Sequence, residues 1–247
     1  MSEPSVLYVF LLALGTALAT GVGALPLLFA RRIPARWIGL GNALAAGLMI
    51  TASFQLVGQG IRFDVARTLI GIVLGLAFIV LAERWLDGRD DMDVAHLRGA
   101  DAKKALLIMG VMTLHSFAEG IGVGVAFGGG AAFGLFIALA IAIHNVPEGL
   151  AISLAMVPKG LSVGRAAAWS VASSLPQPLI AVPAFLFVQR FEPFLPVGLG
   201  LAAGAMIWMA VAELLPEALE NAHAKQVGIA VTVAVVVMTG FQAVLPT

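Results

Sequence analysis

Apolar stretches long enough to cross a lipid bilayer are the feature that most constrains the fold of this chain. A spanning helix needs about 20 mostly apolar residues, and the 247-residue sequence contains eight such stretches. They cover residues 5–30, 37–58, 65–82, 105–127, 131–157, 166–189, 194–217 and 227–245. Hydrophobic residues make up 60% of the chain and charged residues 11%, which is more apolar surface than one soluble core can bury. We therefore expect an all-α, polytopic membrane protein whose residues 1–247 form a single transmembrane domain.

The connections between these stretches predict how the spans are arranged. The longest hydrophilic segment, residues 83–104, is too polar to span and is expected to be a loop between the third and fourth helices. The glycines at 128–130 join the fourth and fifth stretches, and so short a link makes antiparallel neighbours. The sixth stretch contains Pro176, Pro178 and Pro183, which must interrupt its backbone hydrogen bonds within the membrane.

The distribution of basic residues predicts the orientation of the eight spans. An even number of spans places both termini on one side, and cytoplasmic loops carry an excess of Lys and Arg. With the termini outside, eleven of the 14 basic residues are cytoplasmic, and only Arg62, Arg67 and Arg190 are not. We therefore expect extracytoplasmic termini and a cytoplasmic 83–104 loop.

Two copies of an H-x-x-x-E-G motif lie inside the fourth and fifth apolar stretches. The first places His115 four residues before Glu119, and the second, 29 residues later, places His144 four residues before Glu148. Residues i and i+4 share one face of a helix, so each motif directs an imidazole and a carboxylate toward one point. Two neighbouring helices then offer four metal ligands.

The chemistry of these ligands favours a divalent transition metal. An ionised Glu in the middle of a spanning helix costs on the order of 2–3 kcal/mol without a partner. A divalent cation would cancel the charge of two carboxylates, and mixed nitrogen and oxygen ligation suits zinc and its first-row neighbours. Asn145 and Gln177 offer further oxygens, with the alternative that they cap backbone groups freed by the prolines.

Several other residues and function classes have competing interpretations. Glu213 and Glu217, at i and i+4, are either an exit relay for metal or a solvated helix end. A net charge of zero without a basic patch argues against nucleic-acid binding, and the absence of cysteine excludes thiolate metal sites. Neither motif has the H-E-x-x-H order of a metalloprotease. The main alternative to a transporter is an intramembrane metalloenzyme that uses the same His and Glu residues catalytically.

The paired motifs resemble those of the ZIP (Zrt- and Irt-like) divalent metal transporters, in particular their bacterial branch. The resemblance rests on HNVPEG at 144–149, GNALAAGLM at 41–49 and AAGAMIWMAVAELLPEAL at 202–219. It implies a primary metal site of His115, Glu119, His144 and Glu148, with Met49 beside it, although for Met49 ordinary core packing is the better interpretation on chemistry alone. It also implies that Asn145 and the position of Gln177 belong to an adjoining second metal site. Gln177 departs from the pattern, because many bacterial relatives have Glu there.

The resemblance also implies the transport function and its setting. It predicts a homodimer in the bacterial inner membrane that moves divalent metal toward the cytoplasm by alternating access. The ion is a transported substrate, most simply Zn²⁺, although these ligands also suit Fe²⁺, Mn²⁺ or Cd²⁺. The expected protein is not an enzyme and uses no catalytic cofactor.

Overall fold

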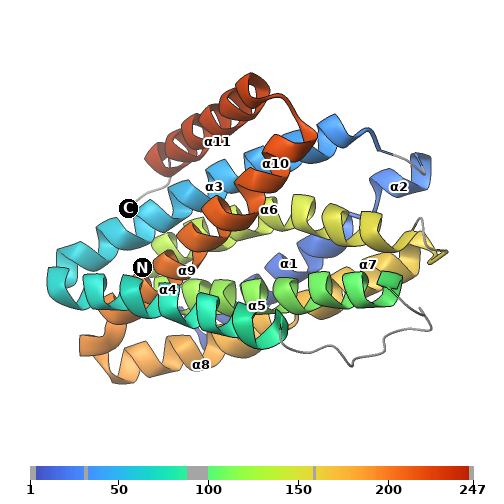
Figure 1. Ribbon diagram of the computed structural model, residues 1–247. Helices are drawn as coiled ribbons and strands as arrows, with labels where there is room; N and C mark the ends of the chain where they lie inside the picture. The colour runs from blue at the N-terminus through green and yellow to red at the C-terminus, as the bar shows by residue number, and fades with distance from the viewer. Residues whose placement is uncertain (1–3, 31–32, 88–99, 158–159, 245–247) are drawn as a thin grey trace.

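The computed structural model describes residues 4–30, 33–87, 100–157 and 160–244, and every regular element in these ranges is a helix (Figure 1). This confirms the predicted all-α architecture. The elements are α1 Val6–Val22, α2 Pro26–Phe29, α3 Ala35–Phe63, α4 Val65–Asp87, α5 Ala100–Gly128, α6 Ala131–Met156, α7 Val163–Ser174, α8 Pro176–Arg190, η2 Glu192–Phe194, α9 Leu195–Met209, η3 Ala210–Leu214, α10 Leu215–Asn221 and α11 Ala224–Val244.

The helices form a bundle of membrane-spanning length. Seven helical stretches of the described residues are long and apolar enough to cross a membrane, and α5 takes the place of the remaining predicted span. Both chain ends lie at the same end of the bundle (Figure 1), as an even number of crossings requires. Helices α4 and α5 extend into the predicted 83–104 loop, to Asp87 and from Ala100, while residues 88–99 lie outside the described part.

Three of the spans are interrupted, and prolines explain where. The sixth span divides into α7 and α8 at Leu175, directly before Pro176, which confirms the predicted break. The first span also bends, because a turn separates α1 from α2, which begins at Pro26. The seventh span contains a π-helical turn, η3, just before Pro216. We did not predict the first-span bend or the π-helical turn.

Glycines allow α4 and α9 to pack at backbone distance. Gly71 and Gly75 on α4 face Gly200 and Gly204 on α9, each pair spaced by four residues. A Cβ atom at any of these positions would lie 2.0–2.2 Å from a backbone oxygen of the partner helix. Small residues at this spacing are typical of helix packing in membranes, where dispersion contacts replace the hydrophobic effect as the driving force.

The glycine that ends each H-x-x-x-E-G motif has the same packing role. On α5, a Cβ at Gly120 would lie 2.7 Å from the backbone oxygen of Gln177 on α8. On α6, a Cβ at Gly149 would lie 1.7 Å from the backbone oxygen of Thr20 on α1. In each motif, His and Glu therefore supply the ligands, while the glycine allows a neighbouring helix to pack closely: α8 against α5, and α1 against α6.

We predict that Gly149→Ala destabilises the protein, because the added methyl group must push α1 away from α6. Overpacking of this kind costs about 1–3 kcal/mol, and the melting temperature of the detergent-solubilised protein measures it. Gly15→Ala on α1 is the matched control, since nothing lies within 4 Å of a Cβ there. Alanine favours a helix over glycine by up to about 1 kcal/mol, so Gly15→Ala should keep or raise the melting temperature. Equal melting temperatures for the two variants would contradict this role of Gly149.

Candidate metal site

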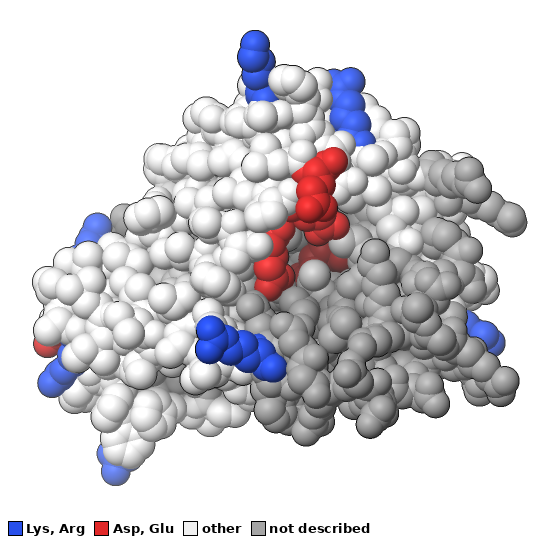
Figure 2. Space-filling view, in the orientation of Figure 1, with Lys and Arg blue, Asp and Glu red and all other residues white. Residues whose placement is uncertain are grey.

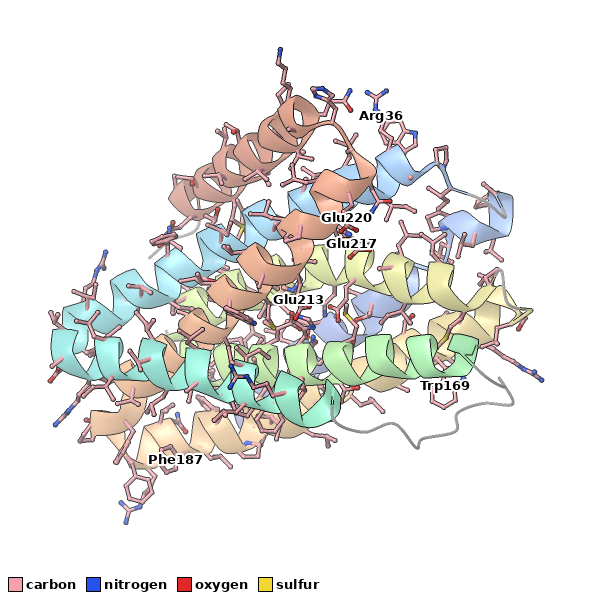
Figure 3. All side chains as sticks on the ribbon, in the orientation of Figure 1. Arg36, Trp169, Phe187, Glu213, Glu217 and Glu220 are labelled. Carbon is pink, nitrogen blue, oxygen red and sulfur yellow. The ribbon has the colours of Figure 1, made fainter. Side chains whose placement is uncertain are left out.

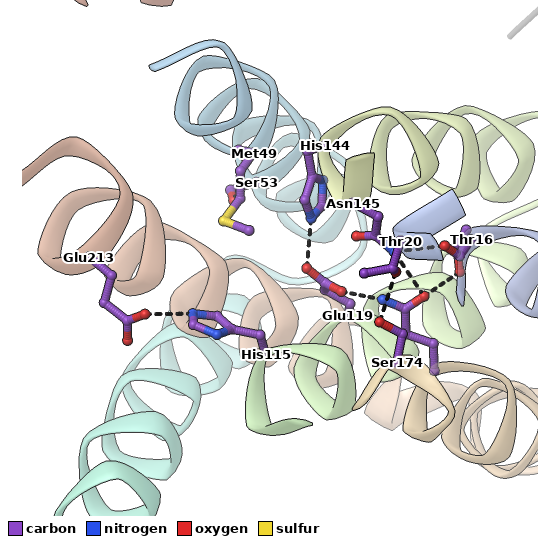
Figure 4. Close-up of polar contacts among 11 residues, drawn as sticks. Thr16, Thr20, Met49, Ser53, His115, Glu119, His144, Asn145, Ser174 and Glu213 are labelled. Carbon is purple, nitrogen blue, oxygen red and sulfur yellow. Dashed lines mark hydrogen bonds and ion pairs between the residues drawn. The ribbon is translucent and has the colours of Figure 1, made fainter. Parts of the chain in front are cut away.

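The two motifs meet in the middle of the bundle. Because α5 and α6 are antiparallel neighbours, their ligand faces oppose one another, and His144 contacts Glu119 between the two helices (Figure 4). The ligands line a small cavity. Side chains from α3 and from η3 complete the cavity wall. The lining residues are Ala45, Met49, Met112, His115, Glu119, His144, Glu148 and Leu214.

Three of the four predicted primary ligands form one buried cluster. Glu119, His144 and Glu148 each present a ligand atom within 4.8 Å of the others. Their exposed fractions are 0%, 2% and 7%, so the cluster is shielded from solvent. His144 Nε2 lies 2.6 Å from Glu119 Oε1, which pairs the two helices directly. Glu148 Oε1 is buried and has no hydrogen-bond partner in the described part of the chain, so it is available to an ion.

The fourth predicted ligand, His115, lines the same cavity but faces a different carboxylate. Its Nε2 lies 3.0 Å from Glu213 Oε2, on η3 (Figure 4). Sequence analysis gave Glu213 two possible roles, exit relay or solvated helix end, and neither included contact with a ligand. For His115 to bind the ion through Nε2, this contact with Glu213 must be exchanged for one with the ion. The other ring nitrogen, Nδ1, is buried and has no hydrogen-bond partner in the described part of the chain.

The π-helical turn explains why Glu213 can reach His115. The N–H of Leu215 donates to the carbonyl of Ala210, five residues earlier, so the turn holds one residue more than an α-helical turn. Pro216, which has no N–H, is the second residue of α10, directly after Leu215. A π turn shifts the register of the residues it carries, and such turns occur frequently at functional sites.

Asn145 and Gln177 form a buried polar network with Thr16 of α1. Figure 4 shows Asn145 and Thr16 on the side of Glu119 away from His115. Asn145 Nδ2 donates to the backbone carbonyl of Thr16 at 2.8 Å and to Gln177 Oε1 at 3.2 Å. The hydroxyl of Thr16 lies 2.5 Å from the same Gln177 oxygen. Gln177 Nε2 donates in turn to Glu119 Oε2. The network thus connects α1, α5, α6 and α8 at the site.

Met49 is the remaining predicted site residue. It lines the cavity from α3 and is 2% exposed. Sequence reasoning missed Thr16, although Thr16 and Thr20 stand at i and i+4 in an otherwise apolar helix, where hydroxyl groups need partners. Thr20 Oγ1 lies 2.8 Å from Ser174 Oγ, which joins α1 to the end of α7.

Among the described residues, exposure increases from the site toward one end of the bundle. The Glu213 side chain is 26% exposed, whereas Glu119 is fully buried. Glu217 and Glu220 continue from Glu213 toward the bundle end that carries Arg36 (Figure 3), and acidic side chains gather on this face of the surface (Figure 2). Toward the opposite end, apolar side chains with 0% exposure close the bundle: Val123, Ile137, Ile141, Met206 and Met209.

This arrangement defines the class of the protein. Two buried carboxylates and two imidazoles inside a spanning bundle are costly unless a cation lies among them, and their mixed N/O character fits a divalent transition metal. A site in mid-bundle that is accessible from one end, on interrupted helices, is the architecture of membrane transporters.

Comparison with known proteins gives the family. Residues 87–245 match the model of the ZIP zinc transporter family, and the chain belongs to this family. The predicted class, a multi-pass membrane transporter of divalent metal and not an enzyme, is thereby confirmed. The alternative of an intramembrane metalloenzyme finds no support in these matches.

Three relatives illustrate the similarity. A protein of Arabidopsis thaliana that carries the name of a zinc transporter is 47% identical over 240 residues, which are 96% of this chain but only 39% of that protein. The zinc transporter ZIPB of Bordetella bronchiseptica is 36% identical over 83% of this chain and 71% of its own length. The zinc transporter GufA of Myxococcus xanthus is 35% identical over 81% of this chain and 84% of its own.

We predict that Glu148→Gln weakens Zn²⁺ binding by at least about 100-fold, since even partners outside the first ligand shell are worth 10- to 100-fold in metal affinity. The change keeps the volume of the side chain and removes its charge. Isothermal titration of the detergent-solubilised protein measures the affinity. Glu192→Gln, at an exposed residue on η2, is the control and should bind like the wild type. Unchanged affinity in Glu148→Gln would remove Glu148 from the ligand set.

Proposed function

We propose that this chain transports Zn²⁺ across the membrane toward the cytoplasm, and that His115, Glu119, His144 and Glu148 bind the ion on the way. The buried cluster of Glu119, His144 and Glu148 carries the proposal, because three ligand groups within 4.8 Å of each other inside an apolar bundle are well placed to bind a cation. Family membership and the names of the relatives support zinc as the cargo.

The residues around the primary ligands have supporting parts in the same proposal. Met49 borders the ion from α3, and Asn145 and Gln177 complete the polar surroundings behind Glu119. The same donors accept Fe²⁺, Mn²⁺ or Cd²⁺, since affinity for first-row metals follows a general order and geometry refines it. We propose these ions as secondary cargo.

The direction of transport rests on the distribution of charge. Eleven of the 14 basic residues fall in the loops that become cytoplasmic when both termini are outside. In this orientation the solvent-accessible end of the site, with Glu213, Glu217 and Glu220, faces the cytoplasm. A homodimer in the bacterial inner membrane completes the proposal, and the apolar side chains exposed along α4, among them Ile70 and Val73, suit lipid or a second copy.

Transport then includes an exchange of partners at His115. Before the ion is bound, His115 contacts Glu213; when it is bound, His115 ligates the ion, and Glu213 is left at the boundary with solvent. This exchange takes place at Nε2, which cannot hold both partners at once, so Glu213 competes with an ion that binds His115 through this nitrogen.

We expect zinc uptake into metal-free proteoliposomes to be saturable for the wild type and abolished by Glu148→Ala and by His144→Ala, because each variant removes a ligand from the buried cluster. Bound metal, counted on the same preparations, should fall in parallel. Glu192→Ala serves as the control and should retain uptake. Tight binding of metal without uptake by the wild type would contradict the transport function.

Replacement of Glu213 by Gln should increase Zn²⁺ affinity by about 3- to 10-fold, because a charge-assisted hydrogen bond that competes for His115 is lost. The increase should disappear in a background that already carries His115→Ala, as a double-mutant cycle requires for an interaction between these two residues. A decrease in affinity would contradict this competition and show that Glu213 supports ion binding, as a ligand or as the partner of the second nitrogen of His115.

A further inference from the structure

We propose that Gln177 occupies the place of a second cation: it is a positioning residue that fixes Glu119 by donating a hydrogen bond, so that the site binds one ion and not two. This inference rests on the proposed function, because it concerns the number of ions at the same site. Its basis is the orientation of two buried amide groups, which the surrounding acceptors determine.

The backbone of α1 fixes the first amide. The carbonyl oxygen of Thr16 can only accept a hydrogen bond, so the group of Asn145 that lies 2.8 Å from it must be the NH₂ group. The second hydrogen of the same NH₂ group points to the nearest atom of Gln177, 3.2 Å away. That atom must be an acceptor, and is therefore Oε1.

The second amide follows from the first. With Oε1 of Gln177 held by Asn145, its NH₂ group faces Glu119 and donates to Oε2, which as a carboxylate oxygen accepts. The hydroxyl of Thr16 lies 2.5 Å from the same Oε1 and 2.6 Å from the carbonyl oxygen of Ala13, and its one hydrogen is shared between these two acceptors. Gln177 is 0% exposed, so water does not compete for these bonds. A donor NH₂ group has no lone pair to offer a metal, and in this orientation Gln177 does not ligate an ion.

The orientation of Gln177 determines which oxygen of Glu119 is left to bind an ion. Its two oxygens have different partners: Oε2 accepts from Gln177, while Oε1 lies 2.6 Å from His144 and faces the ligand cluster. A carboxylate that bridges two cations with one oxygen on each needs both oxygens. The hydrogen bond from Gln177 occupies the second oxygen with a neutral group and leaves one oxygen for the ion.

Close packing holds this arrangement in place. Because a Cβ at Gly120 would lie 2.7 Å from the backbone oxygen of Gln177, the backbones of α5 and α8 are in contact one residue beyond Glu119. The backbone of Gln177 therefore cannot move away from Glu119 without separating α8 from α5. A second divalent cation at this position would also need another anionic ligand to offset its buried charge, and the network supplies only neutral groups.

The test counts Zn²⁺ ions bound to the full chain in detergent, by elemental mass spectrometry after gel filtration. Ions at the site are those lost in the His144→Ala/Glu148→Ala double variant. We expect one ion for the wild type and two for Gln177→Glu, because the carboxylate removes the donor to Glu119 and adds the missing charge. Gln189→Glu makes the same change at an exposed position of the same helix and should keep one ion.

A second variant separates positioning from ion number. Gln177→Ala should keep one ion and lower its affinity by 10- to 100-fold, the usual effect of losing an outer-shell partner of a metal ligand. Two ions on the wild type, or one ion of unchanged affinity in both Gln177 variants, would overturn this inference and leave the transport function standing. No site-specific ion on the wild type would overturn both.

Discussion

Burial of carboxylates inside an apolar bundle is the constraint on which this structure depends. Glu119 meets it with two partners, one for each oxygen: His144 from α6 and Gln177 from α8. Glu148 meets it only in part, because its Oε1 is buried without a hydrogen-bond partner in the described part of the chain. A charged group in a low-dielectric interior is destabilising until an opposite charge is near. A cation that binds beside Glu148 removes this cost, and the incomplete pairing therefore favours cation binding.

The packing of the helices follows from the same need. The partners of Glu119 are His144 on α6 and Gln177 on α8, and Thr16 on α1 contacts Gln177 in turn. Gly120 lets α8 approach α5 at backbone distance, and Gly149 does the same for α1 and α6. Elsewhere, the glycines of α4 and α9 give these two helices an equally close contact. The chain thus combines a tightly packed framework with a small polar centre, and the π turn of η3 adds one carboxylate, Glu213, from the side that solvent reaches.

Much of this could be predicted from the sequence, because the relevant rules act over short distances. The apolar stretches predicted the spans, and Pro176 predicted the break between α7 and α8. The i, i+4 spacing predicted that each His and Glu pair shares one helix face. The contact of His115 with Glu213 could not be predicted, since it depends on a π turn that changes the helical register by one residue. The contacts of Thr16 with Asn145 and Gln177 bring residues together that are more than 100 positions apart in sequence, and no local pattern encodes such an approach.

X-ray absorption at the zinc edge tests most directly whether the paired motifs hold the ion. The sample is zinc-loaded protein carrying His96→Ala and His223→Ala, so that His115 and His144 are the only imidazoles left of the four in the chain. The account predicts a first shell of nitrogen and oxygen at about 2.0–2.2 Å, with the scattering pattern of two imidazoles. A shell without imidazole would place the zinc outside the α5 and α6 motifs and contradict the account.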